Sequence, residues 1–369
     1  MTNDNHTFIT QALGQAAQAL CLSNPNPRVG CVIASPEGVV LGQGFTQQAG
    51  GPHAEIMALR HAAALGHDVQ GATAYVTLEP CSHQGRTGPC CDALAAAGIA
   101  RVVASIADPN PLVSGRGFER LRAAGVAVEV GPGAEASREL NIGFFSRMVR
   151  GVPWVRAKAA ASLDGFTALP NGVSQWITSP EARADGHAWR ARACAVLTGI
   201  GTVLEDDPRL DVREVATPRQ PHLVVVDSHL QTPPTARLFG LERQLFIYTA
   251  SDDAARRQAL EARGATVVRL PNPQGKVDLA ALLRDLAARG VNELHVEAGH
   301  KLNGSLAREG LVDEWLVYLA PKLLGSGRGM AALPALASLD DAAPLQFQAV
   351  DRVGPDVRVL ARGVGRDRF

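Results

Sequence analysis

The sequence predicts a two-domain protein of the α/β class. At 369 residues the chain is longer than a typical single domain. In both halves short apolar segments alternate with amphipathic ones, which is typical of sheets whose strands are joined by helices. Gly151-Val152-Pro153 interrupts this alternation. We therefore expect one domain over residues 1–150 and a second over residues 151–369.

In the first half, helix and strand signals follow one another closely. An Ala-rich amphipathic segment predicts a first helix, which Pro25 and Pro27 terminate. The turn signal at 35–38 joins two apolar segments into a hairpin, and Gly66 ends a helix with apolar residues at helical spacing. The later alternation predicts a three-layer α/β domain with largely parallel inner strands. We expect helices over 7–22, 53–65, 91–97, 118–124 and 135–149, and strands over 29–33, from 39, and over 73–78, 101–106 and 126–130.

The second half repeats the α/β pattern and is long enough to bury its own core. The Gly-rich stretches 198–202 and 324–329 are turns or phosphate-binding loops. No Gly-x-Gly-x-x-Gly follows a strand and opens a helix, so the usual dinucleotide fingerprint is absent. We expect strands over 154–160, 195–199, 222–227, 244–249, 267–268, 293–298, 314–320, 345–351 and 356–362, and helices over 180–193, 252–263 and 278–289 with a short one after 298.

Composition excludes several classes of protein. Basic and acidic residues both number 36, so no net positive charge favours nucleic acid or an anionic membrane. The N-terminus lacks the features of a secretory signal, and no apolar run is long enough for a spanning helix. We therefore expect a cytoplasmic protein that binds neither nucleic acid nor a membrane and has reduced cysteines. Cys21, Cys31 and Cys194 lie among apolar residues, as core cysteines do.

The chemistry is concentrated between Pro52 and Cys91. His53 and Glu55 stand at the start of a helix, and Cys81 follows a strand. Residues two apart on a helix point about 200° apart, so His53 and Glu55 reach one centre only from a first turn. One imidazole, thiolates and an unligated Glu match the zinc-deaminase signature His-x-Glu and Pro-Cys-x-x-Cys, except that the next thiol lies farther along the chain.

These observations do not decide which cysteine is the second thiol ligand. Pro89 begins a helix that carries Cys90 and Cys91. The two side chains diverge by about 100°, so one of them binds the ion, and spacing alone does not select it. A structural zinc with His83 as a fourth ligand is the less favoured alternative. In a catalytic site the metal activates water, and Glu55 moves its proton to a ring nitrogen and to departing ammonia.

Residues 1–150 resemble the deaminase half of the bifunctional deaminase/reductases of riboflavin biosynthesis. The matching stretches are 24–33, 52–55, 77–91 and 108–111. The resemblance implies a cytidine-deaminase-like fold, zinc bound by His53, Cys81 and Cys90, and catalysis by Glu55. It also implies substrate contacts from Asn26, His83, Arg86, Asp108 and Asn110. Two positions depart from the family pattern: Thr46 replaces the usual His, and Gly88 replaces the commoner Pro.

Residues 152–365 are similar to the reductase domain of the same family. Matching segments include 158–165, 174–178, 202–208, 296–299 and 320–325. The resemblance implies a dihydrofolate-reductase-like fold and NADPH as cofactor. It implies NADP contacts from Ala160, Trp176, Thr202, Asp206, Ser228, Gly299, His300, Lys301, Leu302, Asn303, Gly304 and Ser305, and substrate contacts from Lys158, Ser174, Arg190, Leu210, Arg213 and Glu297.

Simple chemistry agrees with several of these roles. Guanidinium groups suit a phosphate monoester because they pair with two of its oxygens. Glu297 could bond sugar hydroxyls, and Asp206 is a candidate for positioning or proton transfer, although Asp207 beside it weakens that choice. Phe166 stands where this family often has a basic residue.

The resemblance, with which these features agree, implies deamination of 2,5-diamino-6-ribosylamino-4(3H)-pyrimidinone 5′-phosphate, followed by NADPH-dependent reduction of the ribosyl group of the resulting aminouracil to ribityl. A nucleic-acid-editing deaminase is one alternative, opposed by the zero net charge and the long inter-thiol loop. A regulatory protein that keeps an inactive zinc site is another, opposed by the complete ligand set. A homo-oligomer is compatible with the sequence.

Overall fold

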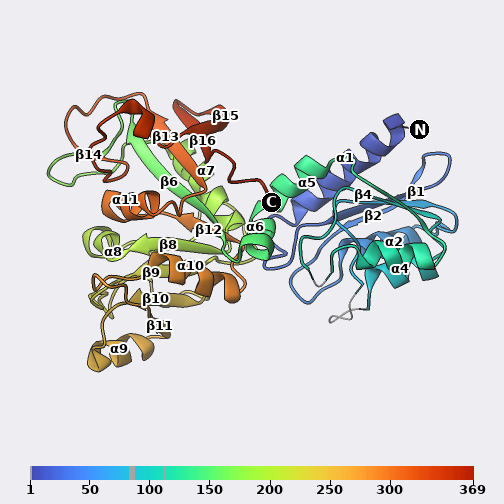
Figure 1. The fold of residues 1–369 in the computed structure, drawn as a ribbon, viewed down its shortest axis with the longest axis horizontal. Helices are drawn as coiled ribbons and strands as arrows, with labels where there is room; N and C mark the ends of the chain where they lie inside the picture. The colour runs from blue at the N-terminus through green and yellow to red at the C-terminus, as the bar shows by residue number, and fades with distance from the viewer. Residues whose placement is uncertain (1, 83–87, 112) are drawn as a thin grey trace. The chain divides into compact units, whose positions relative to one another are not determined.

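The computed structural model describes residues 2–82, 88–111 and 113–369. The chain forms two compact units, one of residues 1–151 with Phe369 and the other of residues 152–368 (Figure 1). None of the described helices is long and apolar enough to cross a membrane.

The first unit is built on a five-stranded sheet in the order β2-β1-β3-β4-β5 (Val40–Phe45, Gly30–Ala34, Thr73–Val76, Arg101–Ala104, Ala127–Val130). β1 is antiparallel to β2 and β3, so the expected hairpin is present. β3, β4 and β5 are parallel to one another. The expectation of parallel inner strands is therefore confirmed for this part of the sheet.

Helices cover both faces of this sheet. Alternate residues of β1 divide between the faces, with Val32 packing under α1 (Thr2–Gln18) and Ile33 packing in the core that α2 (Ala54–Ala64) also lines. The core under α2 also includes α3 (Cys90–Ala96) and α4 (Arg116–Ala123). The expected three-layer arrangement is thus confirmed (Figure 1).

Two expected helices differ in their extent. The helix expected over 7–22 begins and ends earlier, at Thr2 and Gln18. The segment expected as a single helix over 135–149 forms α5 (Ala134–Leu140) and α6 (Ile142–Arg150), which separate at Asn141. The Asn141 amide accepts the N–H of Arg28 at 2.7 Å and donates to the Arg28 carbonyl at 2.9 Å. This contact with a distant loop fixes Asn141 outside helical geometry, which a local pattern does not reveal.

The second unit is built on a nine-stranded sheet. Its first seven strands are parallel to one another, and each of the last two is antiparallel to the strand before it in the sheet. Its order is β11 (Ala265–Arg269), β10 (Leu245–Thr249), β9 (His222–Val226), β8 (Ala195–Gly199), β12 (Glu293–Val296), β6 (Trp154–Ser162), β13 (Glu314–Ala320), β16 (Asp356–Gly363) and β15 (Leu345–Val353).

With two exceptions, the helices of this unit lie in segments that the sequence predicts as helical. They are α7 (Pro180–Arg192), α8 (Ile200–Asp206), α9 (Ala254–Glu261), α10 (Leu279–Ala288), α11 (His300–Arg308) and a 3-10 turn (Leu339–Asp341). The sequence did not predict α8, nor the small pair formed by β7 (Phe166–Ala168) and β14 (Arg328–Gly329). These elements are too short for a periodic pattern to identify.

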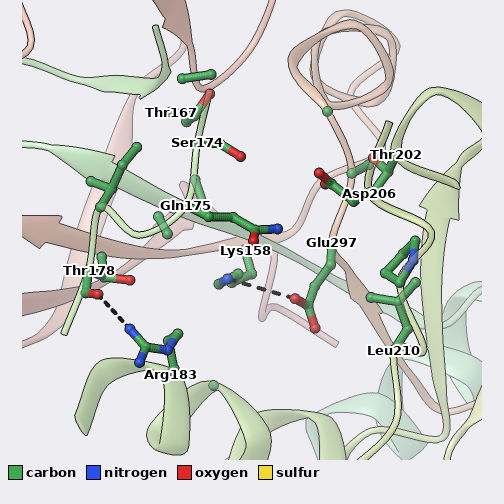
Figure 2. A pocket seen from close by; sticks show the side chains of 18 of the residues that line it. Lys158, Thr167, Ser174, Gln175, Thr178, Arg183, Thr202, Asp206, Leu210 and Glu297 are labelled. Atoms are coloured by element: carbon green, nitrogen blue, oxygen red, sulfur yellow. Dashed lines mark hydrogen bonds and ion pairs between the residues drawn. The ribbon is translucent and has the colours of Figure 1, made fainter. Parts of the chain in front are cut away.

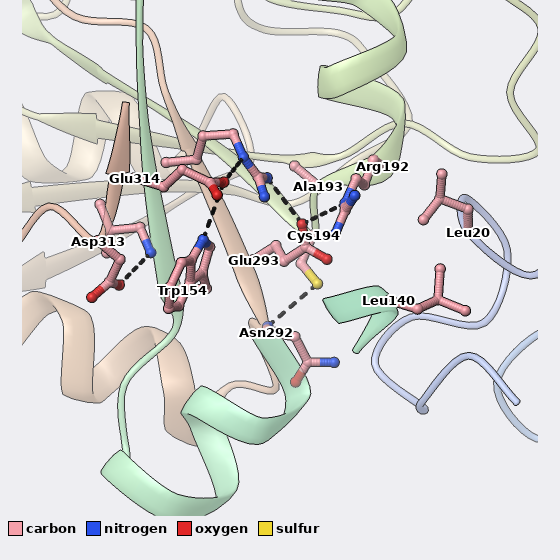
Figure 3. A network of polar contacts seen from close by, with 12 residues as sticks. Leu20, Leu140, Trp154, Arg192, Ala193, Cys194, Asn292, Glu293, Asp313 and Glu314 are labelled. Atoms are coloured by element: carbon pink, nitrogen blue, oxygen red, sulfur yellow. Dashed lines mark hydrogen bonds and ion pairs between the residues drawn. The ribbon is translucent and has the colours of Figure 1, made fainter. Parts of the chain in front are cut away.

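A buried network of charges fixes the position of α7 on the sheet (Figure 3). Arg156 on β6 donates to Glu314 at 2.6 Å and to Glu293 at 3.0 Å, and all three side chains are buried. Arg192, at the end of α7, also donates to Glu293, at 2.8 Å. The network therefore anchors the C-terminal turn of α7, and with it the neighbouring Arg190.

Candidate active sites

The first unit brings three potential metal ligands together. His53 is the N-cap of α2, Cys90 is the first residue of α3, and Cys81 lies in the loop after β3. The ligand atoms of these residues all lie within 4.8 Å of one another. Nδ1 of His53 is 3.5 Å from Sγ of Cys81 and 3.4 Å from Sγ of Cys90. Within the described residues this is the one group of ligand atoms of this kind.

These distances fit a tetrahedral zinc ion. Bonds of about 2.0–2.1 Å to a histidine nitrogen and about 2.3 Å to a thiolate place the two ligand atoms about 3.5 Å apart at tetrahedral angles. The donor set of one imidazole and two thiols is also typical of zinc. The structure therefore provides three ligands of the right kind at the right spacing.

The local electrostatics favour a thiolate at Cys81. Hydrogen bonds with Cys90 and with His53 lower the pKa of the Cys81 thiol, against the effect of burial. Its sulfur also accepts the backbone N–H of Cys90, at the start of α3, at 3.4 Å. N–H groups at a helix start stabilise anions, so Cys81 is prepared for a cation.

Glu55 lies in the first turn of α2, close to the ligand cluster but not part of it. Its side chain is buried, with the residue 3% exposed. Burial, together with the negative charge of Cys81, raises the pKa of Glu55 to about 7. A carboxyl group with a pKa near the working pH can both accept and return a proton.

Cys91 lies outside the ligand cluster. Its Sγ is 3.7 Å from the Asp92 carboxylate, which forms an ion pair with Arg120 on α4. Arg120 also donates to the carbonyl of Ser82 at 3.2 Å. The fold therefore distinguishes two thiols that residue spacing left equal. The alternative fourth ligand His83 lies outside the described residues, as does Arg86.

The other predicted substrate contacts of this unit lie in two loops. Asn26 is in the loop before β1, while Asp108 and Asn110 are in the loop after β4. Asp108 accepts the backbone N–H of Asn110 at 2.8 Å. Their contact with a substrate stays a prediction.

Glu79 organises the second loop, a role that the sequence reasoning missed. Its buried carboxylate accepts the N–H groups of Asp108 at 3.1 Å, Gly115 at 2.9 Å and Gly117 at 2.9 Å. A Cβ on Gly117 would lie 2.1 Å from the carbonyl oxygen of Pro80, so this close approach requires glycine. Glu79 thus connects the segment that carries Cys81 to the loop that carries Asp108.

Thr46, one of the two positions that depart from the family pattern, has a defined set of contacts. The Thr46 hydroxyl is buried and hydrogen-bonded to the backbone of Val29, accepting its N–H at 3.3 Å and donating to its carbonyl at 3.4 Å. The side chain therefore joins the end of β2 to the start of β1.

The second unit contains a cavity of about 720 Å³ at the C-terminal ends of its parallel strands. Most residues that the resemblance implied for this half line it: Lys158, Ala160, Ser174, Trp176, Arg190, Thr202, Asp206, Leu210, Arg213, Glu297, Gly299, His300 and Asn303. Ser228, Lys301, Leu302, Gly304 and Ser305 do not. The roles of all these residues stay predictions.

Two of the residues outside the lining have packing roles. The Ser228 hydroxyl accepts the backbone N–H of Val277 at 3.2 Å. A Cβ on Gly304 would lie 2.3 Å from the carbonyl oxygen of Ala332, so α11 approaches that segment closely because residue 304 is glycine.

Glu297, after β12, is paired with cations on two sides. Arg190 on α7 binds it through two nitrogens, with Nη2 2.9 Å from Oε2. Nζ of Lys158 lies 3.7 Å from the same oxygen (Figure 2). Burial alone would raise the pKa of Glu297, but Arg190 and Lys158 lower it well below its usual value. The carboxylate is therefore a fixed acceptor that faces the cavity.

Asp206 and Asp207 separate clearly in the structure. Asp206 ends α8 and lines the cavity beside Thr202 (Figure 2). Burial, and then Glu205, raise its pKa. Asp207 instead accepts the backbone N–H of Arg237 at 2.8 Å. Of the two carboxylates, Asp206 is the one that faces the cavity.

The cavity also contains cations that the sequence reasoning did not select. Arg183 lies 4.5 Å from the ring centre of Trp176 and donates to the Thr178 carbonyl at 2.9 Å (Figure 2). Arg209, Arg237 and Arg328 line the wall as well. Together with Lys158, Arg190 and Arg213, basic side chains outnumber the acidic Glu205, Asp206, Glu214 and Glu297. The cavity is therefore suited to anionic ligands.

Comparisons with known proteins cover both units. Residues 2–106 match the model of the cytidine and deoxycytidylate deaminase zinc-binding region, and residues 153–359 match that of the RibD C-terminal domain. The chain is 46% identical over 363 residues to riboflavin biosynthesis protein RibD of Escherichia coli K12, covering 95% of this chain and 97% of the relative. It is 39% identical over 353 residues to RibD of Aquifex aeolicus, with coverages of 96% and 97%.

Solved structures give the same result. Acinetobacter baumannii RibD is 37% identical, with a TM-score of 0.89 and coverage of 99% of this chain and 100% of that chain. A diaminohydroxyphosphoribosylaminopyrimidine deaminase/5-amino-6-(5-phosphoribosylamino)uracil reductase from Thermotoga maritima is 31% identical, with a TM-score of 0.85 and coverages of 98% and 99%. The similarity therefore extends through both units.

Proposed function

This chain belongs to the RibD family of bifunctional deaminase/reductases of riboflavin biosynthesis, and on that premise we propose which residues of each unit carry its two reactions. The observation that carries the proposal is the cluster of His53, Cys81 and Cys90 beside the buried carboxyl of Glu55.

In the first unit, the substrate is 2,5-diamino-6-ribosylamino-4(3H)-pyrimidinone 5′-phosphate. His53, Cys81 and Cys90 would hold a zinc ion, which would supply the Lewis acidity that makes water a nucleophile near neutral pH. Water replaces the amino group on a ring carbon, and ammonia leaves. Glu55 accepts the proton from water and delivers it to the ring nitrogen and then to the departing amine, which its pKa of about 7 permits.

The second unit would bind NADPH, which would supply the hydride for reduction of the ribosyl group of the deaminated product to ribityl, with uptake of one proton. Glu297, held by Arg190 and Lys158, orients the sugar through its hydroxyl groups. Asp206, at the cavity wall, is the candidate for positioning or proton transfer, and burial raises its pKa. Arg213 binds the phosphate, as a guanidinium does with two oxygens.

The remaining assignments stay predictions of the same proposal. The ligand is a small phosphorylated pyrimidine rather than nucleic acid, which the balance of 36 basic and 36 acidic residues favours. Cytoplasmic location and homo-oligomerisation also stay predictions.

The test supplies the diaminopyrimidine ribotide with and without NADPH and follows ammonia release and NADPH oxidation separately. We expect ammonia release both with and without NADPH. Where NADPH is present, we expect its oxidation to follow deamination. Ammonia release from tRNA or single-stranded DNA instead would support the editing alternative. Stoichiometric zinc without turnover of any of these substrates would support the regulatory one.

A further inference from the structure

The loop after α8 contains two arginines that share one buried carboxylate. Asp211 is 2% exposed. Its Oδ1 accepts from Nη1 of Arg213 at 2.8 Å, and its Oδ2 is 2.8 Å from Nη2 of Arg209. The two arginine side chains are about half exposed, at 47% and 45%, and both line the cavity. One buried anion therefore orients two cations toward the same space.

The charges of this group do not cancel. One carboxylate faces two guanidinium groups, so a positive charge remains for a ligand. The pairing with Arg213 and Arg209 also lowers the pKa of Asp211, against the effect of burial. Because each guanidinium uses only part of its donors on Asp211, its other N–H groups stay available to oxygens in the cavity.

The backbone of the loop is held on several sides. Arg190 donates to the carbonyl of Asp211 at 2.9 Å, and Arg243 donates to the carbonyls of Leu210 at 2.6 Å and Arg209 at 2.5 Å. His187 accepts the N–H of Arg213 at 3.3 Å. Leu210, between the two anchored residues, has a φ of 50°, a conformation that costs energy in a residue with a side chain. The surrounding contacts maintain this conformation, so the loop is preorganised.

We propose that Asp211 is a positioning residue, which holds Arg209 and Arg213 as a paired receptor for a phosphate monoester, and that Arg209 is a phosphate-binding residue of the reductase site. This inference deepens the proposed function and rests on it for the identity of the substrate. The phosphate of the substrate and the phosphates of NADPH share this chemistry, so the test separates them.

The first experiment measures binding alone, by calorimetric titration of the full-length protein with ribose 5-phosphate and with ribose. We expect the wild type to bind ribose 5-phosphate and Arg209→Ala to weaken this binding at least tenfold. Asp211→Asn should weaken it by a similar factor, and the double variant should lose less than the product of the two factors, because Asp211 acts through Arg209. Absence of phosphate-dependent binding in the wild type overturns the inference.

The second experiment measures reduction of the phosphorylated substrate and of its dephosphorylated analogue. Arg209→Ala and Asp211→Asn should raise KM for the phosphorylated substrate about tenfold, with KM for the analogue and Kd for NADPH changed less than twofold. Equal effects on both substrates would reject the phosphate role, and a selective loss of NADPH affinity would assign the pair to the cofactor instead.

Controls distinguish positioning from folding. Arg257→Ala removes an arginine that is paired with Glu261 and does not line the cavity. Asp313→Asn removes a buried carboxylate that accepts the N–H of Val155 at 2.8 Å and also lies outside the lining. We expect both variants to keep phosphate selectivity. If Asp211→Asn does not fold, the half-exposed Arg209→Ala and Arg209→Lys still decide the question. If the wild type binds ribose 5-phosphate through Arg209 but does not reduce the pyrimidine, the proposed function fails and the phosphate receptor stands.

Discussion

Sγ of Cys90 lies 3.4 Å from Nδ1 of His53. The two residues are 37 positions apart and begin different helices, α3 and α2. Cys91, next in the chain, has its sulfur 3.7 Å from Asp92. The first prediction is therefore that replacement by serine weakens zinc binding at Cys90 but not at Cys91.

Cys90→Ser should lower zinc affinity by more than about tenfold, since the loss of a direct ligand exceeds the effect of losing a supporting contact. Cys91→Ser should keep bound zinc close to one ion per chain. Metal content after dialysis against a weak chelator, measured by atomic emission, checks both variants. Loss of zinc from Cys91→Ser would show that Cys91 is the ligand.

Glu55→Gln should retain zinc but lower the deaminase kcat by about 100-fold or more, because the amide accepts no proton from water. Reduction of substrate that has already been deaminated should be unchanged in this variant, which provides the internal control. Ammonia release and zinc content measured on the same preparation test the prediction. Activity within tenfold of the wild type would exclude a proton-transfer role for Glu55.

Glu79→Gln should destabilise the loop that carries Asp108 and Asn110. The carboxylate accepts three backbone N–H groups, whereas the amide would direct its own N–H₂ toward at least one of them. An unsatisfied buried donor costs about 1–3 kcal/mol. We expect a higher deaminase KM and a lower Tm, with reductase kinetics unchanged. Glu119→Gln, on the exposed side of α4, is the matched control. Equal KM values in the two variants would contradict the role of Glu79.

Acid should destabilise the second unit through His187. Burial, and then the charges of Arg190 and Arg213, lower the pKa of His187 in the folded protein to about 4, below its ordinary value of 6.5. The unfolded chain therefore binds this proton more readily. The stability contributed by neutral His187 is complete above pH 6.5 and is lost as the pH falls toward 4, by up to about 3 kcal/mol.

Denaturant unfolding between pH 7 and pH 4 measures this loss. His187→Gln should reduce the dependence of the free energy of unfolding on pH in that window. It should not abolish the slope, because burial also lowers the pKa values of His222 and His295. An identical slope in wild type and variant would show that His187 does not contribute.

Much of the fold follows from local patterns. Apolar periodicity and turn residues predicted the strands of both sheets and the main helices, because these signals depend on near neighbours in the chain. The segment expected over 135–149 shows where this reasoning stops. Its helical pattern is real on both sides of Asn141, but the bonds from Asn141 to Arg28 span 113 positions and interrupt the helix.

The candidate sites likewise combine features that the sequence reveals with features that only the structure shows. The types of donor in the metal cluster and their positions at element ends are readable from the sequence. The Glu79 carboxylate and the sharing of Asp211 by two arginines are not, since a lone acidic residue gives no sign of what it contacts. Ser228 does not line the cavity, and its hydroxyl accepts the backbone N–H of Val277. The cofactor contact that the family resemblance implies for Ser228 stays a prediction.

The sequence by itself therefore determined the chemistry available: an imidazole, two or three thiols and a carboxyl for the first site, and guanidinium groups for the second. The tertiary structure decided which of these groups face one another. It directed Cys90 rather than Cys91 toward His53, and Asp206 rather than Asp207 toward the cavity. The physical reason is that adjacent residues on a helix or turn point in different directions, and only the packing of distant elements fixes which direction leads into a site.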